Sequence, residues 1–389
     1  MHFLLAITGS IAAIKTPELI RILRKNGHSV QCILTNGGEQ FSSKTALEAL
    51  TEFPVLGPQI FTHNLSENPY AHINISKSAD ALCIAPASAH TIARLAQGMA
   101  DDFLSATVLA SSCPIFLAPA MNHKMWEHPA TQQNIKKLQE YGYTIISPEN
   151  GEMACGDEGT GRMAEISDIL AFLERVNTPQ TLKGKTVLIS LGGTRENLDP
   201  VRFIGNASSG KMGNALAEIF WKKGATVKLC AGMRTEHLSS SRFEISETLS
   251  TSNMCQEMER LAPNADIVVF AAAVADFTPL FPLGEKQKSG KSLVLELSPT
   301  VDIAKKLAET KQPHQIFIGF ALETDEKILK TEMMKKAEAK KFDIVLGNTE
   351  ENLGSDTGTY LFWSKDAGTF EEFSGTKEEV AEKIALSFV

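Results

Sequence analysis

The chain has 389 residues, with 38 basic and 46 acidic side chains and a formal net charge of −8. At roughly 150 residues per domain, this length predicts two or three domains. The sequence has no basic stripe or tail, which argues against nucleic acid or an anionic membrane as the main partner. Hydrophobic residues make up 43% of the chain and charged residues 22%, a composition typical of globular rather than disordered proteins.

No segment of the sequence has the features of a targeting signal or a membrane span. The apolar start, Met1–Ile14, is interrupted by a Thr-Gly-Ser turn and has no basic region before it. The longest apolar run, Ile267–Ala275, is too short to cross a bilayer. The six cysteines never form a CxxC pair, which favours reduced thiols over a disulfide framework or a zinc site. We therefore expect a soluble, cytoplasmic protein.

In the first part of the chain, apolar strands alternate with helices. The expected strands are 2–8, 29–34, 81–85, 114–118 and 144–146. Helices are expected around 15–25, 88–96 and 131–141. Continuous apolar strands separated by helices indicate a parallel sheet that is covered on both faces. In such a sheet, ligands bind outside the carboxyl ends of the strands.

The pattern breaks around Val176–Lys185, where a proline, a glycine and several polar residues interrupt it. This break predicts a first domain over 1–177, a linker over 178–185 and a second domain over 186–389. In the second domain, strands are expected at 186–191, 225–230, 266–270, 315–320 and 343–346, with an edge strand at 359–364. Helices are expected at 211–223, 251–261, 325–340 and 378–386. The predicted fold class is α/β, with two Rossmann-like domains, each a mainly parallel sheet flanked by helices.

Two turns after predicted strands of the first domain are candidate phosphate sites. Gly9 and Ser10 follow the first strand and open a helix, so N–H groups there suit a phosphate, although such a turn is also common without a ligand. The GxGxxG spacing is absent, which argues against a classical NAD site. Ser88 is placed to cap the helix that follows another strand, and ordinary capping is a sufficient explanation for it.

Three further segments carry side chains suited to catalysis. His72 begins the short segment His-Ile-Asn-Ile ahead of a strand, where a single histidine more often has a structural role. Asn122 lies in the Ala118–Trp126 segment directly after a buried strand, where loops form binding sites. Cys155 lies in the glycine-rich segment Gly151–Met163, which could close over a site. Its polar surroundings favour an exposed, reactive thiol over a buried structural one.

The segments TGSIAA, HINI, APAS, PAMNHKMW and ACGDEGTGRM together resemble the phosphopantothenoylcysteine decarboxylases, a family of FMN-dependent flavoproteins. The resemblance covers the first predicted domain and implies that FMN binds at the strand ends. It also implies that FMN oxidises the cysteine moiety of the substrate to a thioaldehyde. The neighbouring carboxylate then leaves as CO2, because the resulting carbanion delocalises onto sulfur, and the reduced flavin returns the hydride.

By position, this resemblance implies a role for each of the three side chains. His72 would act in proton transfer during the oxidation, and Asn122 would hydrogen-bond the substrate carboxylate. Cys155 would protonate the enethiolate carbon during the reduction. The predicted FMN contacts are Gly9, Ser10, Thr35, Ser88, Thr91 and Ala120.

Polar loops also stand at the strand ends of the second domain. Gly192-Gly193-Thr194 follows its first strand, and the polar segment Asn206–Gly213 leads into a helix, an arrangement that suits an anionic or acyl-phosphate ligand. A well-capped helix is the plainer explanation, and the GxxxxGK[ST] spacing of a P-loop is absent. Asp276 ends an apolar run, and Phe320 lies at another strand end. Lys286 lies in a charged loop, for which composition alone favours solvation.

The segments GGTRENLDPVRFIGNASSGKMG, AAAVADF and GFALET resemble the bacterial phosphopantothenate–cysteine ligases, over the rest of the chain. Such enzymes activate 4′-phosphopantothenate with CTP and Mg2+ to an acyl-cytidylate and pyrophosphate, and the amine of L-cysteine then attacks the acyl carbon. By position, Lys286 would support formation of the acyl-cytidylate and Asn206 would stabilise it. The implied CTP contacts are Ala271, Ala272, Asp276, Lys286, Asp302, Phe320, Lys336 and Lys340, and the ligands of Mg2+ stay unknown.

Two positions depart from the ligase pattern. The family's KxKK loop ends here in Ser289, and its Asn-Pro-Asp-Ile segment reads Thr300-Val301-Asp302-Ile303. Both departures concern nucleotide binding, and they leave Lys286 and Asp302 in place.

Because the ligase product is the decarboxylase substrate, the two modules together predict a bifunctional enzyme that makes 4′-phosphopantetheine on the route to coenzyme A. One alternative is a flavin prenyltransferase, which the PAMN element and the Cys155 segment disfavour. Another is an FMN-binding regulatory protein, whose phosphatase-inhibiting members typically carry long acidic tails, unlike Ala385–Val389 here. The resemblance also implies homo-oligomers, with decarboxylase trimers, ligase dimers and a flavin site near a subunit interface.

Overall fold

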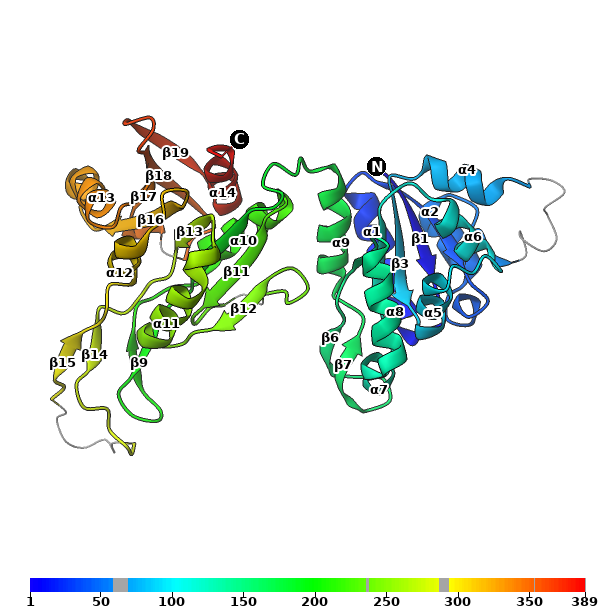
Figure 1. Cartoon of the computed structure of the whole chain (residues 1–389), viewed down its shortest axis with the longest axis horizontal. Coiled ribbons are helices and arrows are strands. Elements are labelled where there is room, and N and C mark those ends of the chain that lie inside the picture. Colours follow the sequence, from blue (N-terminus) through cyan, green and yellow to red (C-terminus); the bar gives the residue numbers. More distant parts are fainter. Residues whose placement is uncertain (59–68, 236–237, 287–293, 353, 389) are drawn as a thin grey trace. The chain divides into compact units, whose positions relative to one another are not determined.

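The computed structural model describes residues 1–58, 69–235, 238–286, 294–352 and 354–388 (Figure 1). The chain divides into two compact units, Met1–Thr178 and Pro179–Val389, and each is described by itself. No helix among the described residues is long and apolar enough to cross a membrane.

The first unit is built on a five-stranded, fully parallel sheet with the order β2-β1-β3-β4-β5. Its strands are β1 (His2–Ile7), β2 (Ser29–Leu34), β3 (Ala81–Ala87), β4 (Ile115–Pro119) and β5 (Thr144–Ile145). The strands lie at the predicted positions, so the predicted strands are confirmed. Their uninterrupted apolar sequences suit a sheet buried on both faces. The strand order reverses between β1 and β3, and ligands of such sheets bind at this switch point.

Helices surround this sheet, and those predicted around 15–25, 88–96 and 131–141 are confirmed as α1, α5 and α8. The helices are η1 (Ile11–Lys15), α1 (Thr16–Lys25), η2 (Gly38–Gln40), α2 (Lys44–Thr51), α4 (Ala71–Ser78), α5 (Ala89–Ala96), α6 (Phe103–Ala110), α7 (His123–Glu127), α8 (Pro129–Glu140), α9 (Ile166–Glu174) and η3 (Arg175–Asn177).

Two segments of the first unit differ from the prediction. The short segment that begins at His72 is part of helix α4, because Ala71 and Ile75, four residues apart, both pack against the core. The glycine-rich segment around Cys155 is a hairpin of β6 (Glu149–Glu152) and β7 (Glu158–Arg162) rather than an irregular loop.

The second unit contains an eight-stranded sheet with the order β12-β11-β8-β13-β16-β17-β18-β19. The first six strands are parallel to one another. The pairs β17–β18 and β18–β19 are antiparallel. The strands are β8 (Thr186–Leu191), β11 (Thr226–Ala231), β12 (Glu244–Glu247), β13 (Ile267–Phe270), β16 (Ile316–Glu323), β17 (Ile344–Thr349), β18 (Thr357–Ser364) and β19 (Phe370–Thr376). Their order is the doubly wound one with its switch point between β8 and β13. The predicted fold class is confirmed in both units.

The predicted helices of the second unit are confirmed, and α12 was not predicted. The helices are α10 (Lys211–Lys222), α11 (Thr251–Leu261), η4 (Ala262–Asn264), α12 (Ile303–Thr310), α13 (Glu326–Ala339), η5 (Glu350–Asn352) and α14 (Lys377–Leu386). The edge position predicted for 359–364 is wrong, because β19 pairs along β18 and takes the edge. The acidic, glycine-containing sequence of β19 gives little sign of a strand.

Two small antiparallel ribbons also belong to the second unit. They are β9 (Arg195–Asn197) with β10 (Phe203–Gly205), and β14 (Phe277–Pro279) with β15 (Leu297–Pro299). The buried carboxylate of Glu196 in β9 accepts a hydrogen bond from the Thr278 hydroxyl in β14 at 3.1 Å, which joins the two ribbons. It also accepts the N–H of Thr251, at the start of α11, at 2.8 Å.

Candidate active sites

A buried threonine organises the switch point of the first sheet. The Thr8 hydroxyl donates to the Pro86 carbonyl at 2.7 Å and accepts the N–H of Ser88 at 2.9 Å, so it ties the turn after β1 to the end of β3. Ser88 in turn caps α5, since its Oγ accepts the N–H of Thr91 at 3.3 Å. Thr8 belongs to the predicted phosphate turn but is not among the predicted FMN contacts, although a threonine that ends an apolar strand beside Gly-Ser is a visible signal.

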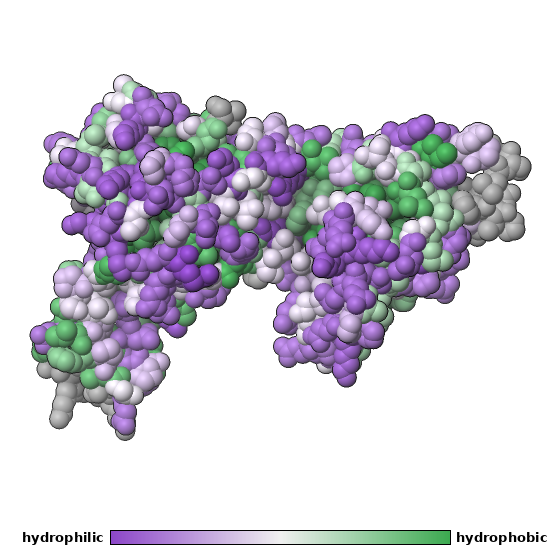
Figure 2. All heavy atoms as spheres, viewed as in Figure 1, coloured by the Kyte–Doolittle hydropathy of each residue, from purple (hydrophilic) through white to green (hydrophobic). Residues whose placement is uncertain are grey.

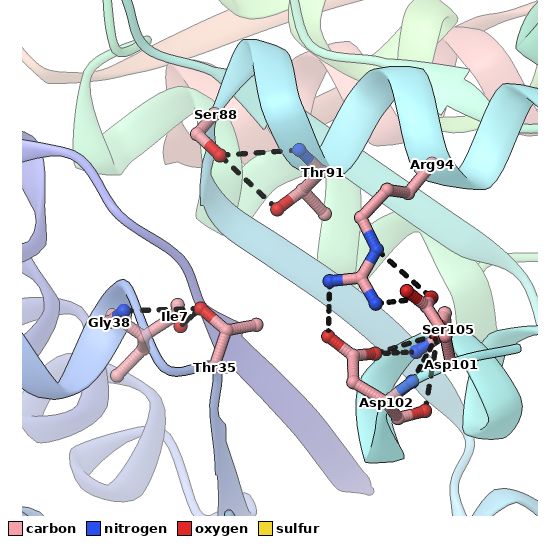
Figure 3. A network of polar contacts seen from close by, with 9 residues as sticks. All are labelled: Ile7, Thr35, Gly38, Ser88, Thr91, Arg94, Asp101, Asp102 and Ser105. Carbon is pink, nitrogen blue, oxygen red and sulfur yellow. Dashed lines mark hydrogen bonds and ion pairs between the residues drawn. The ribbon is translucent and has the colours of Figure 1, made fainter. Parts of the chain in front are cut away.

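The turns after β1 and β2 lie against each other at the same edge of the sheet. Thr35 Oγ1 accepts the N–H of Gly38 at 3.1 Å and donates to the Ile7 carbonyl at 3.4 Å (Figure 3). A Cβ on Gly9 would lie only 3.2 Å from the Cα of Gly37, so this approach favours glycine. Ser10 caps η1.

The predicted flavin contacts therefore gather at the carboxyl ends of four neighbouring strands. Ala120 follows β4, and its N–H donates to the Ala87 carbonyl at 3.1 Å. Arg94, one helical turn after Thr91, pairs with Asp101 and lies 2.8 Å from Asp102, which also caps α6 (Figure 3). Its charge is thus held within the unit, so the groups that remain for a phosphate here are hydroxyls and backbone N–H groups.

Asn122 stands between helix α7 and the β6–β7 hairpin. Its Oδ1 accepts the N–H of Lys124 at 3.0 Å and so caps α7, while its Nδ2 donates to Asp157 Oδ2 at 2.8 Å. Cys155 Sγ lies 3.5 Å from the same Nδ2, and the thiol is exposed, as expected. Hydrogen bonds from Asn122 and then from Cys155 lower the pKa of Asp157 below its usual value. Asp157 was not predicted, because 35 residues separate it from Asn122.

Glycines allow the hairpin to lie directly on α7. A Cβ on Gly161 would lie 2.2 Å from the Met121 carbonyl oxygen, and Met121 donates its N–H to the Gly161 carbonyl at 3.0 Å. Gly159, with φ of 154°, would place a Cβ 2.8 Å from that of His123. This contact holds Cys155 and Asp157 next to Asn122.

His72 lies elsewhere in the first unit. It is half-buried in the first turn of α4, a helix that packs against α6. Figure 1 shows α4 and the pair formed by α7 and the β6–β7 hairpin at opposite ends of the unit. A single copy of the chain therefore brings Asn122 and Cys155 together but does not bring His72 to them.

The second unit has a cavity of about 730 Å3 at the carboxyl ends of β8, β13, β16 and β17. Its lining includes the apolar stretch Ala271–Ala275, which continues the apolar run of the predicted strand 266–270 but forms a loop after β13. All the predicted ligase residues except Lys286 line it: Asn206, Ala271, Ala272, Asp276, Asp302, Phe320, Lys336 and Lys340.

Asn206 lines this cavity, and hydrogen bonds hold its side chain in place. Its Nδ2 donates to the Val274 carbonyl at 2.8 Å and lies 3.5 Å from Asp276 Oδ2. Thr300, which stands where the ligase family's Asn-Pro-Asp-Ile segment has asparagine, donates its hydroxyl to the Ala275 carbonyl at 2.5 Å and its N–H to the Asp276 carbonyl at 2.9 Å. Thr300 thus fastens the loop that carries Asp276.

Two groups of lysines, from different elements, line the cavity. On the α13 side, Lys336 lies 3.3 Å from Glu323 and Lys340 lies 3.0 Å from Asp302. On the side of α10 and α14, Lys211 lies 2.5 Å from Asp356, and Lys377 donates to the Ser355 carbonyl. Each of these lysines therefore has a partner within the chain. Lys211 was noted only as part of a polar segment, and Lys377 was not predicted.

Lys286 is exposed and does not line the cavity; it lies between β14 and residues 287–293, which are outside the described residues and include Ser289. Among the residues that the structure describes, no three His, Cys, Asp or Glu side chains are grouped so that they could hold a metal ion.

Two family models match the chain, one for each unit. The model described as "Flavoprotein" matches residues 1–178, and that of the "DNA/pantothenate metabolism flavoprotein C-terminal domain" matches residues 182–388. The chain is 38% identical to the coenzyme A biosynthesis bifunctional protein CoaBC of Bacillus subtilis, over 100% of this chain and 95% of that protein. It is 41% identical to the Haemophilus influenzae CoaBC protein, over 93% and 91%. The chain belongs to the CoaBC family.

This membership confirms both resemblances seen in the sequence. The chain is a bifunctional enzyme of coenzyme A biosynthesis, with a flavoprotein decarboxylase domain followed by a ligase domain. A relative named cysteine/cysteine sulfinic acid decarboxylase, from an unknown prokaryotic organism, is 39% identical over 81% of this chain and 90% of its own length. Neither a flavin prenyltransferase nor a regulatory protein is better supported than the CoaBC assignment.

Proposed function

We propose that the first unit binds FMN at the β1/β3 switch point and decarboxylates 4′-phosphopantothenoylcysteine. The support for the cofactor is the set of groups at this edge: capped helix N-termini, the Ser10, Ser88 and Thr91 hydroxyls, and glycines at the close contact of two turns. FMN would supply the oxidation of the substrate thiol and the later return of a hydride. Every other step is assigned to side chains of the chain.

In this proposal, Asn122 holds the substrate carboxylate through its amide N–H groups. The amide is neutral, so it orients the carboxylate without an ion pair that would oppose its departure as CO2. Cys155, at the same place, gives its proton to the carbon that loses CO2. His72 moves a proton during the oxidation of the thiol. Its distance from this group along the unit supports an active site shared between copies, with His72 from one subunit and Asn122 with Cys155 from another.

A trimer is the assembly that we propose for this shared site. Exposed apolar residues beside the FMN contacts support an interface there, since Ile11 and Ile14 of η1 are 50% and 66% exposed. The flavin should therefore leave the protein when the trimer dissociates, and a monomer that keeps its flavin in gel filtration would contradict this assembly.

We also propose that the two lysine groups of the second cavity bind two anionic substrates. Lys336 and Lys340, beside Phe320, suit the triphosphate and base of CTP. Lys211 and Lys377, near the N-terminus of α10, suit the phosphate of 4′-phosphopantothenate. Asn206 lines the same cavity, where it would hold the acyl-cytidylate before L-cysteine attacks. Mg2+ would bind chiefly through the phosphates, as it commonly does.

Lys286 belongs to a part of the unit that suits a dimer interface. The β9–β10 and β14–β15 ribbons expose large apolar side chains, among them Val201, Phe203, Phe277 and Phe281 at 46% to 73% exposure (Figure 2). Such a patch is typical of a protein–protein interface. In a dimer, Lys286 would reach an acyl-cytidylate site and offset its negative charge. We place these reactions in the cytoplasm, where the thiols would stay reduced.

A product assay by mass spectrometry tests this function. The purified protein would receive 4′-phosphopantothenate, L-cysteine and Mg2+, with CTP, ATP or no nucleotide. We expect 4′-phosphopantetheine only with CTP. An adduct that keeps its CO2 would mean an active ligase beside an inactive first unit, and loss of CO2 from free cysteine would instead align the chain with the cysteine decarboxylase relative. No CTP-dependent product would contradict the proposal.

A further inference from the structure

The amide that we assign to the substrate carboxylate already holds a carboxylate of the chain. Asn122 Nδ2 donates to Asp157 Oδ2 at 2.8 Å, a distance typical of a hydrogen bond with a charged acceptor. Because Asn122 Oδ1 is used to cap α7, the Nδ2 group is the part of this side chain that remains for a ligand. A substrate carboxylate on Nδ2 would need the position that Asp157 occupies.

We propose that Asp157 is an internal substitute for the substrate carboxylate, which latches the β6–β7 hairpin to Asn122 until substrate displaces it. This inference rests on the role proposed for Asn122. Its basis is that Asn122 Nδ2 donates to a carboxylate in both states, to Asp157 in the free protein and to the substrate in the proposed complex. The hairpin that carries Asp157 also carries Cys155. Asp157 is two residues from Cys155, so its displacement moves the segment that carries the thiol at the moment a substrate arrives.

The surroundings of Asp157 fit a latch rather than a structural anchor. Asp157 and Cys155 are both exposed, and the hairpin is held to α7 independently by the Met121–Gly161 backbone hydrogen bond at 3.0 Å. Loss of the Asp157 carboxylate should therefore release the turn around Cys155 and leave the rest of the hairpin in place. Hydrogen bonding from Asn122 and Cys155 keeps the pKa of Asp157 low, so the carboxylate is charged at neutral pH.

A latch of this kind weakens substrate binding, because the substrate carboxylate can bind Asn122 only during the fraction of time for which the latch is open. If the contact is closed about 90% of the time, removing it tightens carboxylate binding by about tenfold. The effect is confined to ligands that use Asn122 through a carboxylate, because other ligands do not compete with Asp157.

The test compares two ligands that differ only in that carboxylate. We would titrate the full-length flavin-loaded protein calorimetrically with 4′-phosphopantothenoylserine and with 4′-phosphopantothenoylethanolamine, in which a hydroxyl replaces the thiol. Asp157→Ala should tighten binding of the serine compound by about three- to tenfold. Binding of the ethanolamine compound should change by less than about twofold. The matched control is Glu158→Gln, which removes one negative charge from the adjacent exposed residue and should change neither compound selectively.

The latch is overturned if Asp157→Ala tightens both compounds equally, tightens neither, or acts no differently from Glu158→Gln. Asn122→Ala separates this result from a failure of the proposed function. If Asn122 holds the carboxylate, this variant loses the preference for the serine compound, and adding Asp157→Ala to it gives no further tightening. If the preference survives in Asn122→Ala, the role of Asn122 itself is wrong.

Discussion

The two units both carry candidate ligand-binding residues at the carboxyl edge of a parallel sheet, but these residues are arranged in different ways. In the second unit, one cavity collects nearly all the expected ligase residues, and its lysines already have partners in the chain. In the first unit, the expected residues are divided among the strand ends, the β6–β7 hairpin and α4. The comparison teaches that a shared strand topology does not decide whether one copy of the chain brings all the expected site residues together.

The largest expected effect is on the reaction of the first unit alone. Cys155→Ser should slow formation of the reduced product by about 100-fold or more, because a positioned proton donor contributes at least that much. Ligation should continue at the wild-type rate in the same protein, and mass spectrometry would follow both products. A variant that still makes 4′-phosphopantetheine at the wild-type rate would remove Cys155 from the mechanism.

Lys286→Ala should have the next largest effect, on the ligase reaction alone. We expect release of pyrophosphate from CTP to fall by about 100-fold, because a charge that stabilises the transition state is lost. Decarboxylation of added 4′-phosphopantothenoylcysteine is the internal control. Since Lys286 lies outside the cavity in one copy, normal pyrophosphate release would mean that the cavity of one copy is sufficient for ligation.

A smaller effect should follow from a change inside the cavity wall. Lys336→Ala should raise the KM for CTP by about tenfold, because one charge-assisted contact to the nucleotide is lost. Lys335→Ala is the matched control, since Lys335 is the adjacent lysine, pairs with Glu332 and does not line the cavity. Equal changes in both variants would show that only the general charge of α13 matters.

The smallest effect concerns stability rather than chemistry. Burial disfavours the charged form of Asp199, but hydrogen bonds from Arg202 and from the N–H groups of Val201 and Arg202 outweigh it and lower the pKa to about 2. A depressed pKa stabilises the folded chain above the unfolded value of about 3.9 and loses this contribution as the pH falls toward 2. Asp199→Asn should lower the urea midpoint of the second unit modestly at pH 7. This difference from wild type should shrink below pH 4, and a constant difference would contradict the assignment.

Much of the fold could be predicted, because apolar runs bounded by glycine or polar residues mark buried parallel strands. The same reasoning failed where the signal is weak or tertiary. In α4 the apolar residues also alternate, and only packing of Ala71 and Ile75 selects a helix. The strand β19 contains acidic residues and glycine, and its place is fixed by pairing with β18.

The candidate sites divide in a similar way. Residues that follow strands, such as Ser88 and Asp276, could be placed from the sequence because strand ends meet at one edge. Contacts between segments that lie far apart in the sequence could not be predicted in this way. Asp157 is 35 residues from Asn122, and Asp356 is 145 residues from Lys211, so neither pair leaves a local pattern.

The lysines of the ligase cavity have partners within the chain, and an anion that enters the cavity would compete with those partners. A phosphate that binds one of these ammonium groups, as we propose, would compete with a carboxylate or carbonyl of the chain for its N–H donors. Chloride and other weakly binding monovalent anions gain little by such a trade, whereas a doubly charged phosphate gains a stronger contact than the one it displaces. If the proposed substrates bind here, the cavity would therefore favour them over the salts of the surrounding solution before any part of the nucleotide base is recognised.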